Sequence, residues 1–266
     1  MTPPNAGRTA RERARAELTR EIKEEARRQL ATSGADGLSL RAVARKLGMV
    51  SSALYRYFPS RDDLLTALII DAYDAIGSAV EEAIAAVSSA AVPPDVARVG
   101  IVRERWLAGC RAVRSWALAH PHEYALIYGS PVPGYRAPEA TIGPASRVPV
   151  ALVRTLRDAA ASGMLASGAP QTLPEQLADQ TALMAAALAA ADGETSLAVP
   201  ADALVRAVIA WTQLFGMVSF ELFGQFVNSF EPTDALFEYA IGEMAAFVLG
   251  IPAGDSGIAA RPCTFG

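Results

Sequence analysis

Residues 40–65 read LRAVARKLGMVSSALYRYFPSRDDLL, and this segment predicts two short helices joined by a tight turn. The apolar positions of the first helix have the i, i+3, i+4, i+7 spacing of one buried face: Leu40, Val43, Ala44 and Leu47. Ser39 can cap this helix, and Gly48 can end it because a sharp turn favours a residue that tolerates positive φ. A second short helix is expected over 50–58, where Pro59 stops it.

Helices are also expected on both sides of this segment. Upstream, residues 18–33 carry apolar side chains four apart with charges between them, and Gly34 ends that helix. Downstream, Ser60 and Asp63 form the start signature of a long helix. The remaining candidate helices are 64–90, 97–119, 121–128, 145–162, 174–192, 201–228 and 233–249. No stretch keeps the alternation of a strand, so the expected fold class is all-α.

Two short helices behind a supporting helix match the helix-turn-helix that proteins use to bind DNA. A recognition helix enters the major groove, so small or polar residues suit its leading positions, and hydroxyl-bearing aromatics or cations on its flanks can reach phosphates. The leading residues are Ser51, Ser52 and Ala53, and the flanking residues are Tyr55, Tyr57 and Arg61. Taken singly, the tyrosines also fit helix packing and the arginine a solvated surface, but their joint spacing favours DNA.

Residues 18–76 resemble the DNA-binding head of TetR/AcrR regulators, through the motif quoted above. The resemblance implies that the leading residues face bases, that the flanking residues contact phosphates, and that Arg41 reaches DNA from the preceding helix. Where the family often has a capping Ser or Thr, this chain has Val50. Because the leading positions hold no Arg, Lys, Asn or Gln, we expect Arg41 or DNA shape to carry more of the base specificity.

The charge distribution separates the two ends of the chain. Residues 1–61 hold 13 Lys and Arg against 6 Asp and Glu, a net charge of +7, whereas the rest is −11 within a total of −4. A basic head on an acidic body suits a protein of which only one end approaches a polyanion. The arginines from Arg8 to Arg15 form either an arm that enters the minor groove or an inert tail.

The expected domain order is a flexible basic arm (1–17), a helix-turn-helix domain (18–63), a helical ligand-binding and dimerisation domain (64–250) and a flexible tail (251–266). The N-terminus has no apolar core of a signal peptide, and charged or polar residues interrupt the richest apolar stretches, so a cytoplasmic protein without a membrane span is expected. Cys110 and Cys263 lack the spacing of a disulfide framework or zinc site.

The last two predicted helices are apolar around most of their circumference, which requires cover on two sides. We expect the subunit core to cover one side and a second copy the other, as in the homodimers of TetR-like proteins. The side chains assigned to that interface are Phe215, Val218, Leu222, Phe237, Ile241, Met244 and Val248. A purely internal core is the alternative.

Aromatic and histidine residues concentrate between 106 and 135, ahead of a Gly/Pro-rich loop. This segment also resembles the C-terminal domain of a TetR subgroup with similar Trp, His-Pro and Tyr landmarks. A largely apolar pocket for a small effector is expected from Trp106, His120, Tyr124, Tyr128, Trp211 and Phe215, although aromatics at helical spacing are more often core. His120 and His122 have no ligand cluster around them, so neither a metal nor another cofactor is expected.

The motifs of common enzyme classes are missing from the sequence, so no catalytic residues are assigned. The resulting hypothesis is a ligand-responsive regulator that binds double-stranded DNA. It acts as a repressor and releases a near-palindromic operator when a small effector binds. The alternative is a helical small-molecule carrier or interaction protein without specific DNA binding.

Overall fold

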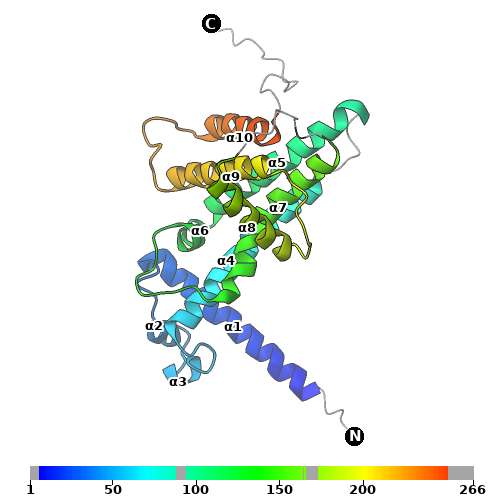
Figure 1. Ribbon diagram of the computed structural model, residues 1–266. Coiled ribbons are helices and arrows are strands. Elements are labelled where there is room, and N and C mark those ends of the chain that lie inside the picture. The colour runs from blue at the N-terminus through cyan, green and yellow to red at the C-terminus, as the bar shows by residue number, and fades with distance from the viewer. Residues whose placement is uncertain (1–5, 88–93, 164, 166–172, 251–266) are drawn as a thin grey trace. The chain divides into compact units, whose positions relative to one another are not determined.

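The computed structural model describes residues 6–87, 94–163, 165 and 173–250, and this part of the chain is helical without strands (Figure 1). The expected all-α class is therefore confirmed. The helices are α1 (Ala6–Ser33), α2 (Leu40–Lys46), α3 (Ser51–Leu54), α4 (Arg61–Ala86), α5 (Pro94–Ala119), α6 (Pro121–Tyr128), the short 3₁₀ helix η2 (Glu139–Thr141), α7 (Ile142–Ala161), α8 (Glu175–Ala191), α9 (Ala201–Leu222) and α10 (Asp234–Leu249). The predicted tail 251–266 lies outside the described residues.

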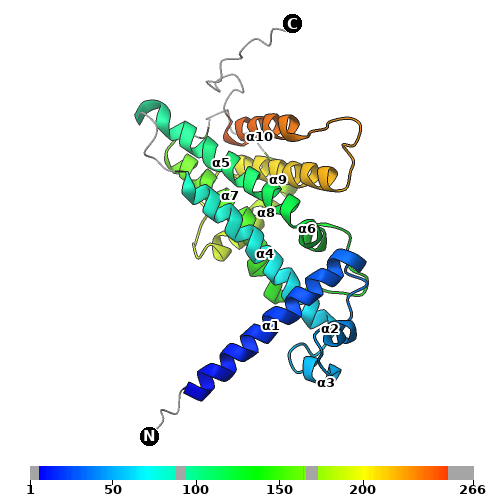
Figure 2. The ribbon, with the colours of Figure 1, turned by 180° about the vertical axis from the view of Figure 1, so that it is seen from behind.

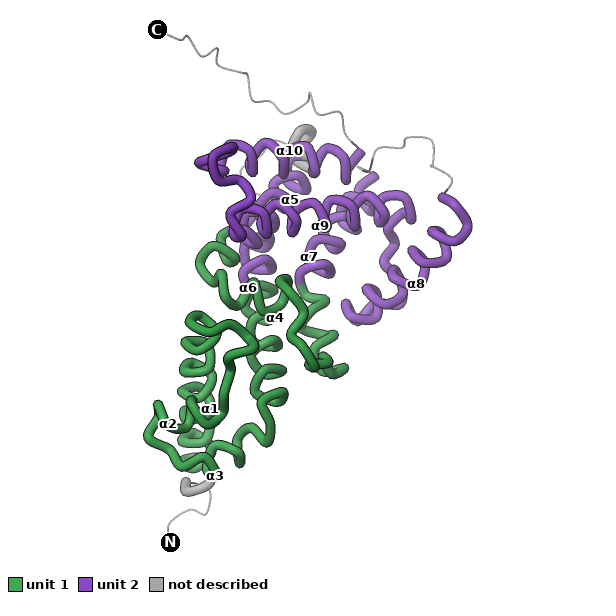
Figure 3. The backbone as a smooth tube through the Cα atoms, turned by 90° about the vertical axis from the view of Figure 1, so that its left-hand side faces the viewer, with its two compact units in different colours: residues 1–78, 115–147 green, residues 79–114, 148–266 purple. Residues whose placement is uncertain are grey.

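The chain forms two compact units (Figure 3). Unit 1 comprises residues 1–78 and 115–147, and unit 2 comprises residues 79–114 and 148–266. This division differs from the boundary expected at residue 63, because α6 and the loop after it pack on the core of the helix-turn-helix.

The core of unit 1 joins the first four helices. Ile22 and Ala26 of α1 face Val43 of α2, Leu54 of α3 and Leu64 of α4, and all five are fully or almost fully buried. Burial of a leucine or isoleucine side chain stabilises a fold by about 1.5–3 kcal/mol. A few such contacts are therefore enough to hold the short helices α2 and α3, which would be unstable in isolation.

Helix α1 begins at Ala6, well before the predicted start at residue 18, so residues 6–17 of the predicted flexible arm are helical. This segment is rich in alanine, arginine and glutamate, which have high helix propensity. Arg20 pairs along the same helix with Glu17 and Glu24, at the i,i+3 and i,i+4 spacings. The periodicity of apolar residues could not reveal the extension, because residues 10–17 of the added turns are exposed.

Helix α7 contributes to the core of unit 2 through buried residues that follow one another from Val150 to Val153 and so occupy more than one face. Leu152 of α7 lies close to Gly109 of α5, whereas Val153 packs with Leu204 of α9. Helices α9 and α10 lie side by side, as Figures 1 and 2 show from opposite directions.

An arginine of α5 connects the last two helices of unit 2. The guanidinium of Arg114 pairs with Glu221 of α9 at 2.7 Å and with Asp234 of α10 at 3.0 Å. It also lies 4.9 Å from the ring centroid of Phe237. The hydrogen bonds to Arg114 lower the pKa of Glu221 below its ordinary value.

Helix α9 is, among the described helices, long and apolar enough to cross a membrane by length and composition alone. Core helices of soluble proteins pass the same criterion. Leu204, Leu214 and Val218 of α9 are buried inside unit 2, and 39% of its most apolar window is buried.

The side chains that we assigned to a dimer interface lie mainly inside the subunit. Six of them are buried in the described structure, namely Phe215, Val218, Phe237, Ile241, Met244 and Val248, and Leu222 is half-buried. The exposed apolar side chains of α9 and α10 are instead Ile209, Phe220, Tyr239 and Phe247. Because both faces of these helices are apolar, the sequence pattern did not distinguish the inner face from the outer one.

Candidate nucleic-acid interface

The turn between α2 and α3 has the local geometry that the sequence predicts. The Oγ of Ser39 accepts a hydrogen bond from the backbone N–H of Ala42 at 3.4 Å, as a helix cap does. Gly48 has φ +66°, and the N–H of Met49 after it returns to the carbonyl of Ala44 at 2.8 Å. This closure is the left-handed helix end for which glycine is best suited.

Helix α3 is shorter than expected, covering Ser51–Leu54 and continuing as turns rather than as helix to residue 57. No side chain caps its start, in agreement with the apolar residue Val50 at that position. Leu54 and Phe58 are buried and attach this segment to the core of unit 1. Their anchoring holds the recognition segment in place without a long helix.

The leading residues of the recognition segment are accessible. Ser52 is exposed, and Ser51 and Ala53 are half-buried. Next to them, the side chain of Tyr55 is 41% exposed even though it is aromatic. Small hydroxyl or methyl groups beside an exposed phenol permit close approach to a groove and a hydrogen bond to a phosphate.

Tyr57 is placed differently from Tyr55, because its half-buried ring packs against the core of unit 1. The guanidinium carbon of Arg15 lies 5.5 Å from the centroid of this ring, within cation–π range. This contact brings an exposed cation of α1 next to the recognition segment. Sequence reasoning had treated Arg15 as part of a flexible arm.

Arg61, expected at a phosphate, turns into unit 1. Its Nη2 donates to the carbonyl of Ala35 at 2.7 Å and its Nε to the carbonyl of Leu38 at 3.3 Å. These bonds tie the start of α4 to the turn before α2. In this arrangement two of the three guanidinium nitrogens are engaged by the protein's own backbone.

Several cations around the recognition segment remain on the surface. Arg41, which we expected to reach DNA, is exposed on α2. The sequence assignment missed Arg45 and Lys46 on the same helix and Arg56 after α3, all of them exposed. These cations contribute to the positive charge of residues 1–61, but a count of charges does not show which side chains face the recognition segment.

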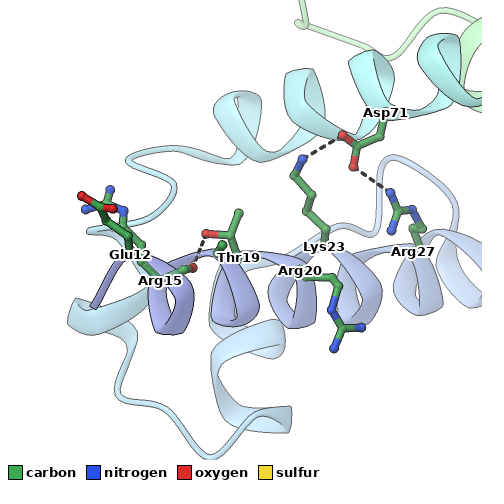
Figure 4. A pocket seen from close by; sticks show the side chains of 8 residues that line it. Glu12, Arg15, Thr19, Arg20, Lys23, Arg27 and Asp71 are labelled. Atoms are coloured by element: carbon green, nitrogen blue, oxygen red, sulfur yellow. Dashed lines mark hydrogen bonds and ion pairs between the residues drawn. The ribbon is translucent and has the colours of Figure 1, made fainter. Parts of the chain in front are cut away.

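A shallow groove of about 500 Å³ lies along α1 in unit 1 (Figure 4). Lys23 and Arg27 reach from α1 to the carboxylate of Asp71 on α4, at 2.8 and 2.7 Å. Arg20 points away from that carboxylate (Figure 4). Because Asp71 already pairs with two cations of the groove, these side chains serve helix packing rather than binding of an added anion.

Three of the expected ligand-binding residues lie in unit 1. His120 is exposed, stacks on Trp116 with ring centroids 5.0 Å apart, and its Nδ1 lies 3.0 Å from the carbonyl of that residue, at the end of α5. Tyr124 is fully buried. Its ring lies 5.2 Å from that of Tyr128, and burial raises the pKa of the Tyr128 phenol. This group is therefore largely core, with His120 on the surface.

The other three, Trp106, Trp211 and Phe215, lie in unit 2. Trp106 of α5 and Phe215 of α9 are buried, and the rings of Trp211 and Phe215 are 5.3 Å apart. The indole nitrogens of both tryptophans are buried without a hydrogen-bond partner among the described residues. The predicted pocket set is thus divided between the two units.

Two family models match the chain: the one described as bacterial regulatory proteins, tetR family, over residues 22–68, and the one described as tetracyclin repressor-like, C-terminal domain, over residues 106–244. The HTH-type transcriptional regulators Mb1846 of Mycobacterium bovis and Rv1816 of Mycobacterium tuberculosis are each 40% identical over 220 residues, which is 80% of this chain and 84% of the relative.

Solved structures show the same fold. The structure of SCO4313, assigned as a regulatory protein, has a TM-score of 0.64 at 33% identity, over 88% of this chain and 97% of that one. A Rhodococcus sp. RHA1 protein of unknown function has a TM-score of 0.60 at 23% identity, over 88% and 95% of the two chains, which is a likeness of fold.

Proposed function

We propose that this chain, which belongs to the TetR family of bacterial regulatory proteins, binds a near-palindromic DNA site as a homodimer and leaves it when a small molecule binds the C-terminal domain. Repression follows if the bound dimer blocks access to a promoter in the cytoplasm. The observation that supports DNA binding most directly is the accessible recognition segment, with Ser52 and Tyr55 exposed among surface cations.

Specificity and affinity come from different groups in this proposal. Ser51, Ser52 and Ala53 approach base edges, and Arg41 adds a guanidinium that can bind a guanine in bidentate fashion. Tyr55 contributes a phosphate contact from its exposed phenol. Affinity falls as salt concentration rises. Each cation that neutralises a phosphate makes the slope of log affinity against log salt concentration more negative by about 0.9.

The dimer in this proposal uses the outer face of α9 and α10. Ile209 and Phe220 of α9 and Tyr239 and Phe247 of α10 are large, apolar and exposed. A two-fold axis through this face would pair it with itself, as isologous interfaces require. Two heads held about 34 Å apart would then occupy successive major grooves on one side of the duplex.

The effector acts through a difference in affinity. A small, largely apolar molecule must bind the DNA-incompatible arrangement of the dimer more tightly than the DNA-bound one, since otherwise it shifts no population. By linkage, DNA then weakens effector binding by the same factor. The inward-facing aromatics of α5 and α9 support an apolar effector.

Selection of bound duplexes from random DNA tests this function. We expect winning sites with two related half-sites, bound as two protein chains per duplex. Arg41→Ala and Tyr55→Ala should weaken binding to the winner, whereas Arg136→Ala, which removes an exposed cation outside the recognition segment, should not. Recovery of no enriched sequence, together with weak and salt-insensitive retention on duplex DNA, would contradict the proposal.

A further inference from the structure

Helix α1 continues past the core of unit 1, and one of its faces changes character there. Positions 11, 15, 18, 22 and 26 are three or four residues apart and therefore share a face of the helix. Ile22 and Ala26 on this face are fully buried, and Leu18 packs against the same core. The next two positions toward the N-terminus are Arg15 and Arg11, and both are exposed. The face that is apolar inside the core is therefore basic beyond it.

This basic face begins beside the recognition segment. The guanidinium carbon of Arg15 lies 5.5 Å from the ring centroid of Tyr57, which follows α3. Arg11 is about 6 Å further along the helix axis. The first turns of α1 stand clear of the other helices of unit 1, at the end of the unit that holds α3 (Figures 1 and 2). A duplex bound at the recognition segment would therefore have this face of α1 next to it.

Arg11 takes no part in the interactions that hold unit 1 together. It forms no hydrogen bond or ion pair with a side chain among the described residues. The cations further along α1 differ, because Arg20, Lys23, Arg27 and Arg28 each have a carboxylate within ion-pair distance. An exposed guanidinium without such a partner can neutralise a phosphate and need not break an existing pair to do so.

The helical form of this segment determines which part of a duplex it can reach. An α-helix with its side chains is about 10–12 Å across, whereas the minor groove of B-DNA is about 6 Å wide. Residues 10–17 are helical, so they do not fit into that groove as an extended arm would. A helix can instead lie against the sugar-phosphate backbone, where a guanidinium binds phosphate oxygens without reading bases.

We infer that the first turns of α1, residues 10–17, form a second DNA-contacting surface, in which Arg11 binds a backbone phosphate beside the groove that the recognition segment enters. The inference rests on the proposed DNA binding and adds to it a contact that does not depend on base sequence. In a homodimer each subunit contributes one such contact, so the effect on affinity is doubled.

Two exposed arginines of the same segment provide the test and its matched control. Arg11→Ala removes the inferred contact, and Arg11→Lys keeps its charge. Arg13→Ala removes the same charge from a different face, because position 13 lies about 160° around the helix from both Arg11 and Arg15. All three variants are compared with the unmutated protein on the duplex that the protein selects from random DNA.

We expect Arg11→Ala to reduce the dependence of affinity on salt. Loss of one phosphate contact in each subunit makes the slope of log affinity against log salt concentration less steep by about 1.8, so the loss of affinity from about 50 to 200 mM salt shrinks about tenfold. Hydroxyl-radical footprinting should show fewer protected backbone positions in Arg11→Ala and the full set in Arg11→Lys and Arg13→Ala. Equal slopes and footprints in Arg11→Ala and Arg13→Ala would overturn the inference.

A further variant separates a helix from a flexible arm. Ala14→Pro interrupts the helix before position 14 and leaves Arg11 in the chain, because proline is accepted only in the first turn of a helix. Residues 10–17 are exposed, so the urea midpoint should stay the same while the salt slope and the footprint follow those of Arg11→Ala. Unchanged DNA binding in Ala14→Pro would indicate a flexible arm and overturn the inference. Failure of the proposed function is recognised separately, because the unmutated protein would then select no duplex, and the inference would fail with it.

Discussion

The guanidinium of Arg61 donates a 2.7 Å hydrogen bond to the carbonyl oxygen of Ala35, so the first residue of α4 is joined to the turn that follows α1. A second bond, to the carbonyl of Leu38, completes the attachment. The position that sequence comparison associates with phosphate contact thus has a structural partner inside the head. Through Arg61, the start of α4 is held against the turn that precedes α2 and the recognition segment.

This attachment predicts that Arg61→Ala destabilises the protein as well as weakening DNA binding. Loss of two hydrogen bonds from a partly buried guanidinium should lower the free energy of unfolding by about 1–3 kcal/mol. Urea unfolding of the free protein measures the effect. Arg41→Ala removes an exposed cation of the same head and should leave the urea midpoint unchanged. An unaltered midpoint in Arg61→Ala would show that the two carbonyls do not depend on this side chain.

The contact between Arg15 and Tyr57 predicts energetic coupling in DNA binding. Arg15→Ala should weaken binding to the selected duplex, and most of that loss should disappear when Tyr57→Ala is already present, because the cation and the ring support each other. A double-mutant cycle of DNA affinities should give a coupling of about 0.5–1 kcal/mol. Strictly additive losses would mean that Arg15 acts without the ring.

The exposed face of α9 and α10 predicts that Phe220→Glu dissociates the homodimer. A charge in the middle of an apolar interface leaves an unpaired ion where two subunits meet, so sedimentation at micromolar concentration should show monomers that no longer bind DNA tightly. Leu183→Glu is the matched control, since Leu183 is a still more exposed apolar residue on α8. A dimer that survives Phe220→Glu, or is lost equally in the control, would place the interface elsewhere.

The pair between Arg114 and Glu221 predicts a loss of stability in acid. Hydrogen bonds from Arg114 lower the pKa of Glu221 below its ordinary value of 4.5, so the carboxylate stabilises the folded state above that pH. As the pH falls through the lowered pKa, the carboxylate takes up a proton and this contribution disappears. Glu221→Gln should lower stability at pH 7 and reduce the dependence of stability on pH below 4.5, measured by urea unfolding.

The control for this prediction is Glu82→Gln. Glu82 is exposed on α4, belongs to the same unit and forms no ion pair with a described residue. Its removal should therefore leave both the stability at pH 7 and its decline in acid as they are in the unmutated protein. The prediction is wrong if Glu221→Gln follows the same acid profile as the unmutated protein.

Local signals determined the elements around the recognition segment. The cap at Ser39 and the left-handed turn at Gly48 are both present where the sequence predicts them. The pair between Ser60 and Asp63 also forms at the start of α4, with Oγ to carboxylate at 2.7 Å. Such signals involve residues at most four positions apart, so they can be read without knowledge of distant contacts.

The sequence by itself determined the all-α class and the position of the helix-turn-helix with its exposed small residue Ser52. Only the tertiary structure decided which face of α9 and α10 is buried and that Arg61 binds the backbone near Ala35. The physical reason is that helix periodicity depends on neighbours along the chain. The choice between two apolar faces, or between solvent and a distant carbonyl, depends on which other helices arrive there.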